Sequence, residues 1–91
     1  MPESCEATVT LTGDLHARPA GALALAAAKF ESAVELTAGG GRADGKSVLA
    51  IMGLGAAGGQ EVTVRATGPD AGEAVAALIG ILTEATRVGG S

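Results

Sequence analysis

The stretch VTVRATGPDAGEAVAALIGILTEAT, residues 62–86, contains the change of period that decides the fold. In residues 62–67 valine and alanine alternate with polar residues, which is the two-residue period of a strand with one buried face. From Asp70 to about Thr86 the apolar residues recur instead at helical spacing, at positions 75, 78, 79 and 82. A half-buried strand followed by an amphipathic helix favours an antiparallel sheet that helices cover on one face.

The start of this helix carries capping residues. Asp70 is expected to accept a hydrogen bond from the amide three residues on, while Glu73 reaches back toward the start of the helix. Pro69 keeps the residue before it out of the helical conformation. The sequence therefore predicts that the helix begins at Asp70.

Two further segments have the strand period, and a glycine-rich turn predicts a fourth strand. Residues 7–12 place alanine, valine and leucine against threonines, and residues 34–37 place valine and leucine against Glu35 and Thr37. The residues Ala38-Gly39-Gly40-Gly41 are typical of a hairpin turn with positive φ. This turn predicts a short strand around Arg42 and Ala43.

Two other segments favour helices. Ala17–Lys29 is rich in alanine, and its Pro19 falls in the first turn, where the missing N–H has no helical partner in any case. Ser47–Met52 fits a short helix with Ser47 as its N-cap and Gly53 as its stop. Both helices lie between predicted strands.

Length and composition fit one domain. The chain has 91 residues, 47% of them hydrophobic, and Phe30 is its one aromatic residue, so a modest core of aliphatic side chains is expected. The predicted order is βαββαβα, an α+β open-faced sandwich in which a four-stranded antiparallel sheet carries three helices on one face. We expect residues 1–91 to form a single domain with residues 89–91 as a disordered tail.

Charge and cysteine content argue against several classes of function. The formal net charge is -4 and the six Lys and Arg residues are scattered, which disfavours a nucleic-acid partner. Cys5 is the one cysteine, so neither a disulfide nor a metal or redox site is predicted. No apolar run reaches the roughly 20 residues that span a bilayer, and the first residues do not resemble a signal peptide. We expect a cytoplasmic monomer without cofactor, metal or membrane insertion.

His16 is the one histidine, and it lies at the start of the first predicted helix. A helix start offers unpaired N–H groups, here those of Ala17 and Arg18, and about half a positive charge, which together favour the oxygens of a phosphoryl group. The Arg18 guanidinium can bind the same oxygens in a bidentate manner. A neutral imidazole has one unprotonated ring nitrogen, so His16 can act as a nucleophile. The alternative is that His16 only caps the helix.

Two motifs, LHARPA (Leu15–Ala20) and GKSVLAIMGLG (Gly45–Gly55), resemble those of one known family, the HPr family of bacterial phosphocarriers. The segment LHARPA, Leu15–Ala20, is similar to the phosphorylation-site signature of that family. The segment GKSVLAIMGLG, Gly45–Gly55, is similar to its regulatory serine segment and lies at the expected distance. The family fold has the same βαββαβα order, so the resemblance covers essentially the whole chain. One departure is Asp14, because the family usually has glycine before the Leu-His pair; the added carboxylate can repel a phosphoryl group.

The resemblance implies a phosphoryl carrier and not an enzyme that turns over a small molecule. His16 would take a phosphoryl group on Nδ1 from enzyme I, which obtains it from phosphoenolpyruvate, and give it to enzyme IIA domains for sugar uptake. Arg18 would stabilise the charge. Ser47 would be the target of a dedicated HPr kinase/phosphorylase as well as a helix cap. The surface that meets these partners would include the apolar residues after Ser47, namely Val48, Leu49 and Met52.

Two alternatives stay open. One is a regulatory member of the same family, such as the nitrogen-related branch, that is not coupled to sugar uptake, although Lys46-Ser47 favours the sugar branch. The other is a small nucleotide-binding protein, since Gly40–Ser47 matches the phosphate-loop pattern. A working phosphate loop follows a buried parallel strand, whereas residues 34–37 alternate between apolar and polar. The context therefore argues against nucleotide binding.

Overall fold

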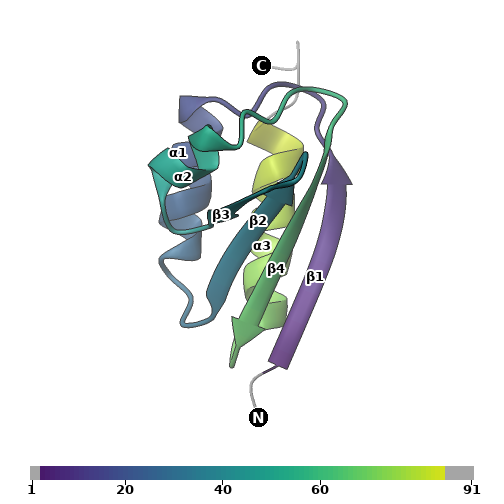
Figure 1. The fold of residues 1–91 in the computed structure, drawn as a ribbon. Coiled ribbons are helices and arrows are strands. Elements are labelled where there is room, and N and C mark those ends of the chain that lie inside the picture. Colours follow the sequence, from purple (N-terminus) through teal and green to yellow (C-terminus); the bar gives the residue numbers. More distant parts are fainter. Residues whose placement is uncertain (1–2, 86–91) are drawn as a thin grey trace.

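The computed structural model describes residues 3–85, which form a four-stranded antiparallel sheet and three helices (Figure 1). The strand order across the sheet is β1-β4-β2-β3. The fold class and the element order βαββαβα are confirmed, while the expected disordered tail at 89–91 lies outside the described residues. Along the chain the elements are β1 (Glu3–Thr10), α1 (Ala17–Ala27), β2 (Ala33–Ala38), β3 (Gly41–Asp44), α2 (Val48–Gly53), β4 (Glu61–Gly68) and α3 (Ala71–Ala85).

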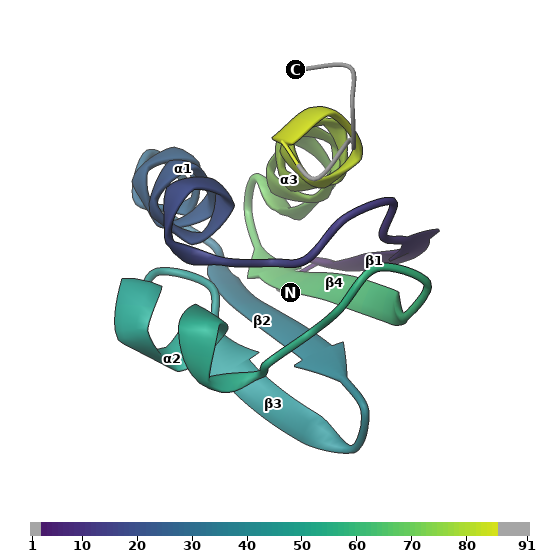
Figure 2. The same cartoon turned by 90° about the horizontal axis from the view of Figure 1, so that it is seen from above.

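The sheet has one covered face and one polar face. Helices α1 and α3 lie over the covered face, and α2 packs beside α1 at the β3 edge (Figure 2). On the polar face, Thr8 and Thr63 share a hydrogen bond of 2.8 Å between their side-chain oxygens. The two-residue period of the sequence explains this division, because alternate residues of the inner strands are buried: Val34, Leu36, Val62, Val64 and Ala66.

The core is built from aliphatic side chains and alanines. Phe30, the one aromatic residue, is only partly buried and packs against the edge of this core. Alanines on the inner faces of α1 and α3 have no exposed surface, which lets both helices approach the sheet closely. The fully buried residues of the two helices include Pro19, Ala20, Leu23, Ala27, Ala71, Ala74, Leu78 and Leu82.

The first strand differs from its predicted bounds. β1 begins at Glu3, earlier than the strand predicted over 7–12, because its ladder with β4 runs from the pair Glu3–Gly68 to the pair Thr10–Glu61. The hairpin turn between β2 and β3 is confirmed, since Gly39 and Gly40 have φ angles of 56° and 83°. Positive φ at both central residues is the requirement of the type I′ turn, which matches the twist of the flanking strands.

Asp70 does not cap its own helix as the sequence predicts. Its Oδ1 accepts hydrogen bonds from the Ser32 amide at 2.9 Å and the Ser32 hydroxyl at 2.5 Å, and its Oδ2 accepts from the Glu31 amide at 3.0 Å. The Asp70 amide donates to Ser32 Oγ at 3.2 Å. Ser32 is only 1% exposed, so these bonds satisfy a buried polar side chain.

Gly68 makes this connection between distant loops possible. Its φ is +148°, and a Cβ atom built there would lie 2.7 Å from the Ser32 Cα. The end of β4 can therefore press against the loop after α1 only because residue 68 has no side chain. Capping-box reasoning considers only neighbours in the sequence, and Ser32 lies 38 positions away.

We predict that Asp70→Asn lowers the melting temperature at about pH 7 and that the difference from the parent shrinks in acid. The hydrogen bond from the Ser32 side chain, followed by that from the Glu31 amide, holds the pKa of Asp70 below its usual 3.8. A carboxyl group whose folded pKa is lowered stabilises the protein above its unfolded pKa and loses that contribution as the pH falls through the folded pKa. Thermal unfolding of both proteins, from about pH 7 down to about pH 2, measures the effect. A difference that does not change with pH would contradict it.

Candidate functional site

His16 occupies the N-cap position of α1, but its side chain does not cap the helix. The residue has extended backbone angles, φ -106° and ψ -164°, and its imidazole makes no capping hydrogen bond. Only its backbone takes part in the helix, because the His16 carbonyl accepts the first helical hydrogen bond, from the Ala20 amide at 3.0 Å. The exposed imidazole is therefore available for chemistry, and the alternative of a histidine that serves only as a side-chain cap is not what the geometry shows.

The first turn of α1 supplies donors next to this imidazole. The N–H groups of Ala17 and Arg18 have no carbonyl four residues back within the helix, and Pro19 has no N–H. No acidic residue lies in the first turn. Pro19 is buried, as its place in the first turn allows. The N-terminus of α1 thus presents two amides and the positive end of the helix dipole to an anion.

Arg18 adds a cation to the same turn. The residue is exposed, and its guanidinium forms neither a hydrogen bond nor an ion pair with any residue between 3 and 85. A guanidinium that is not engaged with a carboxylate keeps its planar set of donors for an oxyanion. The imidazole, the two amides and the guanidinium thus belong to three consecutive exposed residues at the start of α1.

The loop that carries His16 is held against a second loop. We call residues 11–16 the His16 loop and residues 56–60 the facing loop. The Leu15 amide donates to the Ala56 carbonyl at 2.9 Å, and the Gly59 amide donates to the Leu11 carbonyl at 2.8 Å. Leu15 is itself buried in the core, so the residue before His16 is fixed both by packing and by its backbone.

Ser47 is the N-cap of α2, as predicted. Its Oγ accepts a hydrogen bond from the Ala50 amide at 3.2 Å, and the residue is partly exposed. Lys46, directly before it, donates from Nζ to the Phe30 carbonyl at 3.0 Å, which ties the start of α2 to the loop that follows α1. The helix continues through Gly53 and ends at the cap residue Leu54, so Gly53 does not stop it as the sequence predicts.

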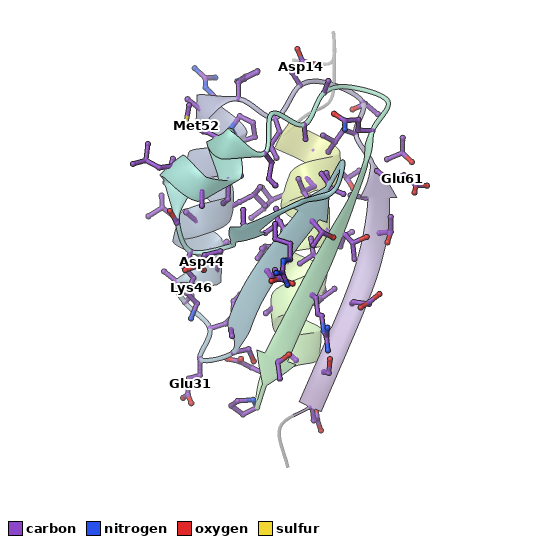
Figure 3. All side chains as sticks on the ribbon, in the orientation of Figure 1. Asp14, Glu31, Asp44, Lys46, Met52 and Glu61 are labelled. Atoms are coloured by element: carbon purple, nitrogen blue, oxygen red, sulfur yellow. The ribbon has the colours of Figure 1, made fainter. Side chains whose placement is uncertain are left out.

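The apolar residues predicted as a partner surface are exposed. Leu49 is 82% exposed, Met52 41% and Val48 38%, whereas Ile51 of the same helix is fully buried. Figure 3 places Met52 and Asp14, from the His16 loop, toward the same end of the molecule. The structure adds one residue that sequence reasoning missed, Leu25 of α1, which is 72% exposed.

Helical spacing in α1 could have identified Leu25. The buried residues of α1 include positions 20, 23, 24 and 27, which recur at three and four residues and form one stripe. Leu25 falls outside that stripe. We call Leu25, Val48, Leu49 and Met52 the apolar patch, which belongs to two helices that pack against each other.

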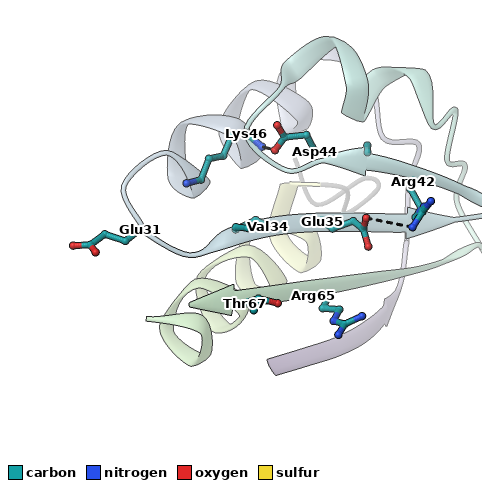
Figure 4. Close-up of a pocket in the computed structure, with 10 residues that line it drawn as sticks. Glu31, Val34, Glu35, Arg42, Asp44, Lys46, Arg65 and Thr67 are labelled. Atoms are coloured by element: carbon teal, nitrogen blue, oxygen red, sulfur yellow. Dashed lines mark hydrogen bonds and ion pairs between the residues drawn. The ribbon is translucent and has the colours of Figure 1, made fainter. Parts of the chain in front are cut away.

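A shallow groove of about 950 Å³ lies on the polar face of the sheet (Figure 4). Its lining combines three cations with three carboxylates, and Arg42 is already paired with Glu35 at 3.9 Å. None of the residues of the His16 loop or the apolar patch lines it. The balanced charge gives no preference for a phosphate group. The charged residues are Glu31, Glu35, Arg42, Asp44, Lys46 and Arg65.

The phosphate-loop pattern at Gly40–Ser47 does not form a phosphate loop. Gly41–Asp44 is strand β3, and its residues pair with β2 from Ala38–Gly41 to Glu35–Asp44. A phosphate loop needs successive backbone amides to converge on a nucleotide, whereas in an extended strand they point alternately toward β2 and away from it. Between residues 3 and 85, no three His, Cys, Asp or Glu side chains gather as a metal ion would need, and no helix has the length and apolar character to cross a membrane.

Comparison with known proteins identifies relatives over nearly the whole chain. The model of a family described as the PTS HPr component phosphorylation site matches residues 3–84. The histidine-containing phosphocarrier protein of Mycoplasma is 32% identical, with a TM-score of 0.76, over 90% of this chain and 99% of that one. The phosphocarrier protein HPr of Bacillus anthracis str. Ames is 29% identical, with a TM-score of 0.77, over 90% and 98%. The catabolite repression protein Crh of Bacillus subtilis, seen as an intertwined dimer with a swapped domain, is 36% identical, with a TM-score of 0.71, over 81% and 85%.

Proposed function

Because the chain belongs to the HPr family of phosphocarriers, we propose that it accepts a phosphoryl group on His16 and passes it on to another protein. One observation supports this most directly. The only histidine of the chain is exposed at a helix start, and its side chain makes no capping hydrogen bond. It lies within the LHARPA segment that resembles the phosphorylation-site signature. The protein acts in this role as a covalent intermediate between two partners and turns over no small molecule alone.

The proposed step is a phosphoryl transfer to imidazole. The lone pair of His16 Nδ1 forms the bond to phosphorus while the bond between phosphorus and the donor breaks, and that electron pair leaves with the donor. The Ala17 and Arg18 amides and the Arg18 guanidinium stabilise the phosphoryl oxygens during the step. The return step runs the same sequence in reverse, toward the next acceptor. The site must therefore stabilise the phosphoryl group weakly enough that the acceptor can remove it.

The proposed donor is enzyme I, charged by phosphoenolpyruvate, and the proposed acceptors are enzyme IIA domains of sugar uptake in the cytoplasm. The apolar patch supports docking of such partners, because Leu49 and Leu25 would otherwise leave apolar surface in water. We propose that residues 1–91 work as one domain and as a monomer. Ser47 is proposed as a regulatory site for HPr kinase/phosphorylase.

A regulatory role is the second candidate. The likeness to Crh, named as a catabolite repression protein, supports it at 36% identity. In that role, as in the nitrogen-related branch, phosphate on the chain would alter a partner and would not be passed to sugar uptake. Transfer from phosphorylated His16 to an enzyme IIA domain separates the two candidates.

We predict that His16→Ala folds like the parent but accepts no phosphate from enzyme I and phosphoenolpyruvate. The side chain is exposed and makes no capping bond, so its loss removes little stability, while it removes the proposed nucleophile. Intact-protein mass after incubation, with the melting temperature as the control for folding, measures both parts. Phosphorylation of this variant to the level of the parent would disprove the assignment of His16.

We predict that Arg18→Ala slows phosphoryl transfer on the order of tenfold without abolishing it, because two helix amides still hold the oxygens. The loss is smaller than for a buried oxyanion donor, because Arg18 is exposed to solvent. Arg18→Lys is the matched control, because it keeps the charge but loses the bidentate geometry. Its transfer rate should fall between those of the parent and the alanine variant. Equal rates for the alanine variant and the parent would remove Arg18 from the site.

We predict that Ser47→Asp raises the KM for phosphorylation by enzyme I about fivefold or more while the melting temperature stays near that of the parent. Aspartate still caps a helix, and a negative charge is favourable at the start of α2. The charge acts instead on the partner that docks on the adjacent apolar patch. Ser47→Asn is the matched control, since it caps equally well without the charge. An unchanged KM for the aspartate variant would leave Ser47 as a helix cap only.

A further inference from the structure

Asp14, the residue that departs from the family pattern, has a specific partner in the structure. Its Oδ1 accepts a hydrogen bond from the Gly58 amide at 3.0 Å. Gly58 belongs to the facing loop and is 44 positions away in the sequence. The carboxylate that the sequence suggested as a repulsive charge is therefore engaged in holding two loops together.

The bond lies between two backbone connections of the same loops. Leu15 is bonded to Ala56 on one side of it, and Leu11 is bonded to Gly59 on the other. The loops also touch at the backbone, because a Cβ atom built on Gly58 would lie 3.3 Å from the Gly13 Cα. Asp14 thus adds a charge-assisted bond in the middle of a close contact, two residues before the histidine.

We propose that Asp14 is a positioning residue for His16, which acts by holding the His16 loop on the facing loop; this inference rests on the proposed phosphoryl transfer. Asp14 and Leu15 are both fixed to the facing loop, so the chain enters α1 in one direction. The His16 Cα and the two free amides then keep one relative placement before the donor arrives, which limits where the imidazole can lie. Ordering in advance lowers the barrier of the transfer step and leaves docking of the partner almost unchanged.

The alternative effect of Asp14 is repulsion between its charge and the phosphoryl group. A matched pair of variants separates this effect from positioning. Asp14→Asn removes the charge but keeps a side-chain oxygen that can accept from the Gly58 amide, whereas Asp14→Ala removes both. Positioning therefore predicts that asparagine rescues the alanine defect, and repulsion predicts that both variants gain rate.

The test measures kcat and KM for phosphorylation of the parent and both variants by enzyme I with phosphoenolpyruvate, together with hydrogen exchange of the Gly58 amide. We expect Asp14→Ala to lower kcat about tenfold with KM within about twofold, and to speed exchange at Gly58, while Asp14→Asn stays within about twofold of the parent in both. Unchanged kcat in the alanine variant, or the same change in both variants, would overturn the positioning role while leaving the carrier role intact. A parent protein that accepts no phosphate would overturn the carrier role itself, and the exchange measurement would still report whether Asp14 holds the loops.

Discussion

Strand β4 is the element on which the rest of the structure depends. It pairs with β1 on one side and β2 on the other, and its inner residues have no exposed surface. The segments at its two ends also hold α1. The facing loop, before β4, is bonded to the His16 loop that leads into α1. Asp70, after β4, is bonded to Ser32 in the loop that leaves α1.

This arrangement explains how a small aliphatic domain can hold the backbone of the proposed phosphoryl acceptor in place while its side chain stays exposed. The helix that follows His16 is fixed at both ends through backbone and carboxylate hydrogen bonds, so the His16 backbone is held in place while its side chain stays exposed. The N-terminus of α1 offers free amides beside His16. Helix α2 packs against α1, and the two helices together carry the apolar patch. In the proposed function, chemistry and docking would thus be supplied by neighbouring surfaces, and the groove on the polar face is lined by other residues.

The sequence predicts the parts of this structure that depend on local periodicity. The two-residue period of β4, the Ala38–Gly41 turn and the Ser47 cap are all confirmed, because each depends on neighbouring residues. The roles of Asp14 and Asp70 could not be read in the same way. Both carboxylates bond to residues about forty positions away, and such partners are decided by how the sheet brings loops together. His16 could be proposed from the sequence because the other residues of the proposed site are its neighbours in the chain.

The most direct measurement is the chemical form of phosphate on the parent protein after incubation with enzyme I and phosphoenolpyruvate. A carrier that uses His16 gains one phosphoryl group on the peptide that contains this residue. A bond between phosphorus and an imidazole nitrogen is lost in acid and survives in base, so the added mass should disappear on acidification. An acid-stable phosphate, or a phosphate on any other peptide, would contradict phosphoryl transfer through His16.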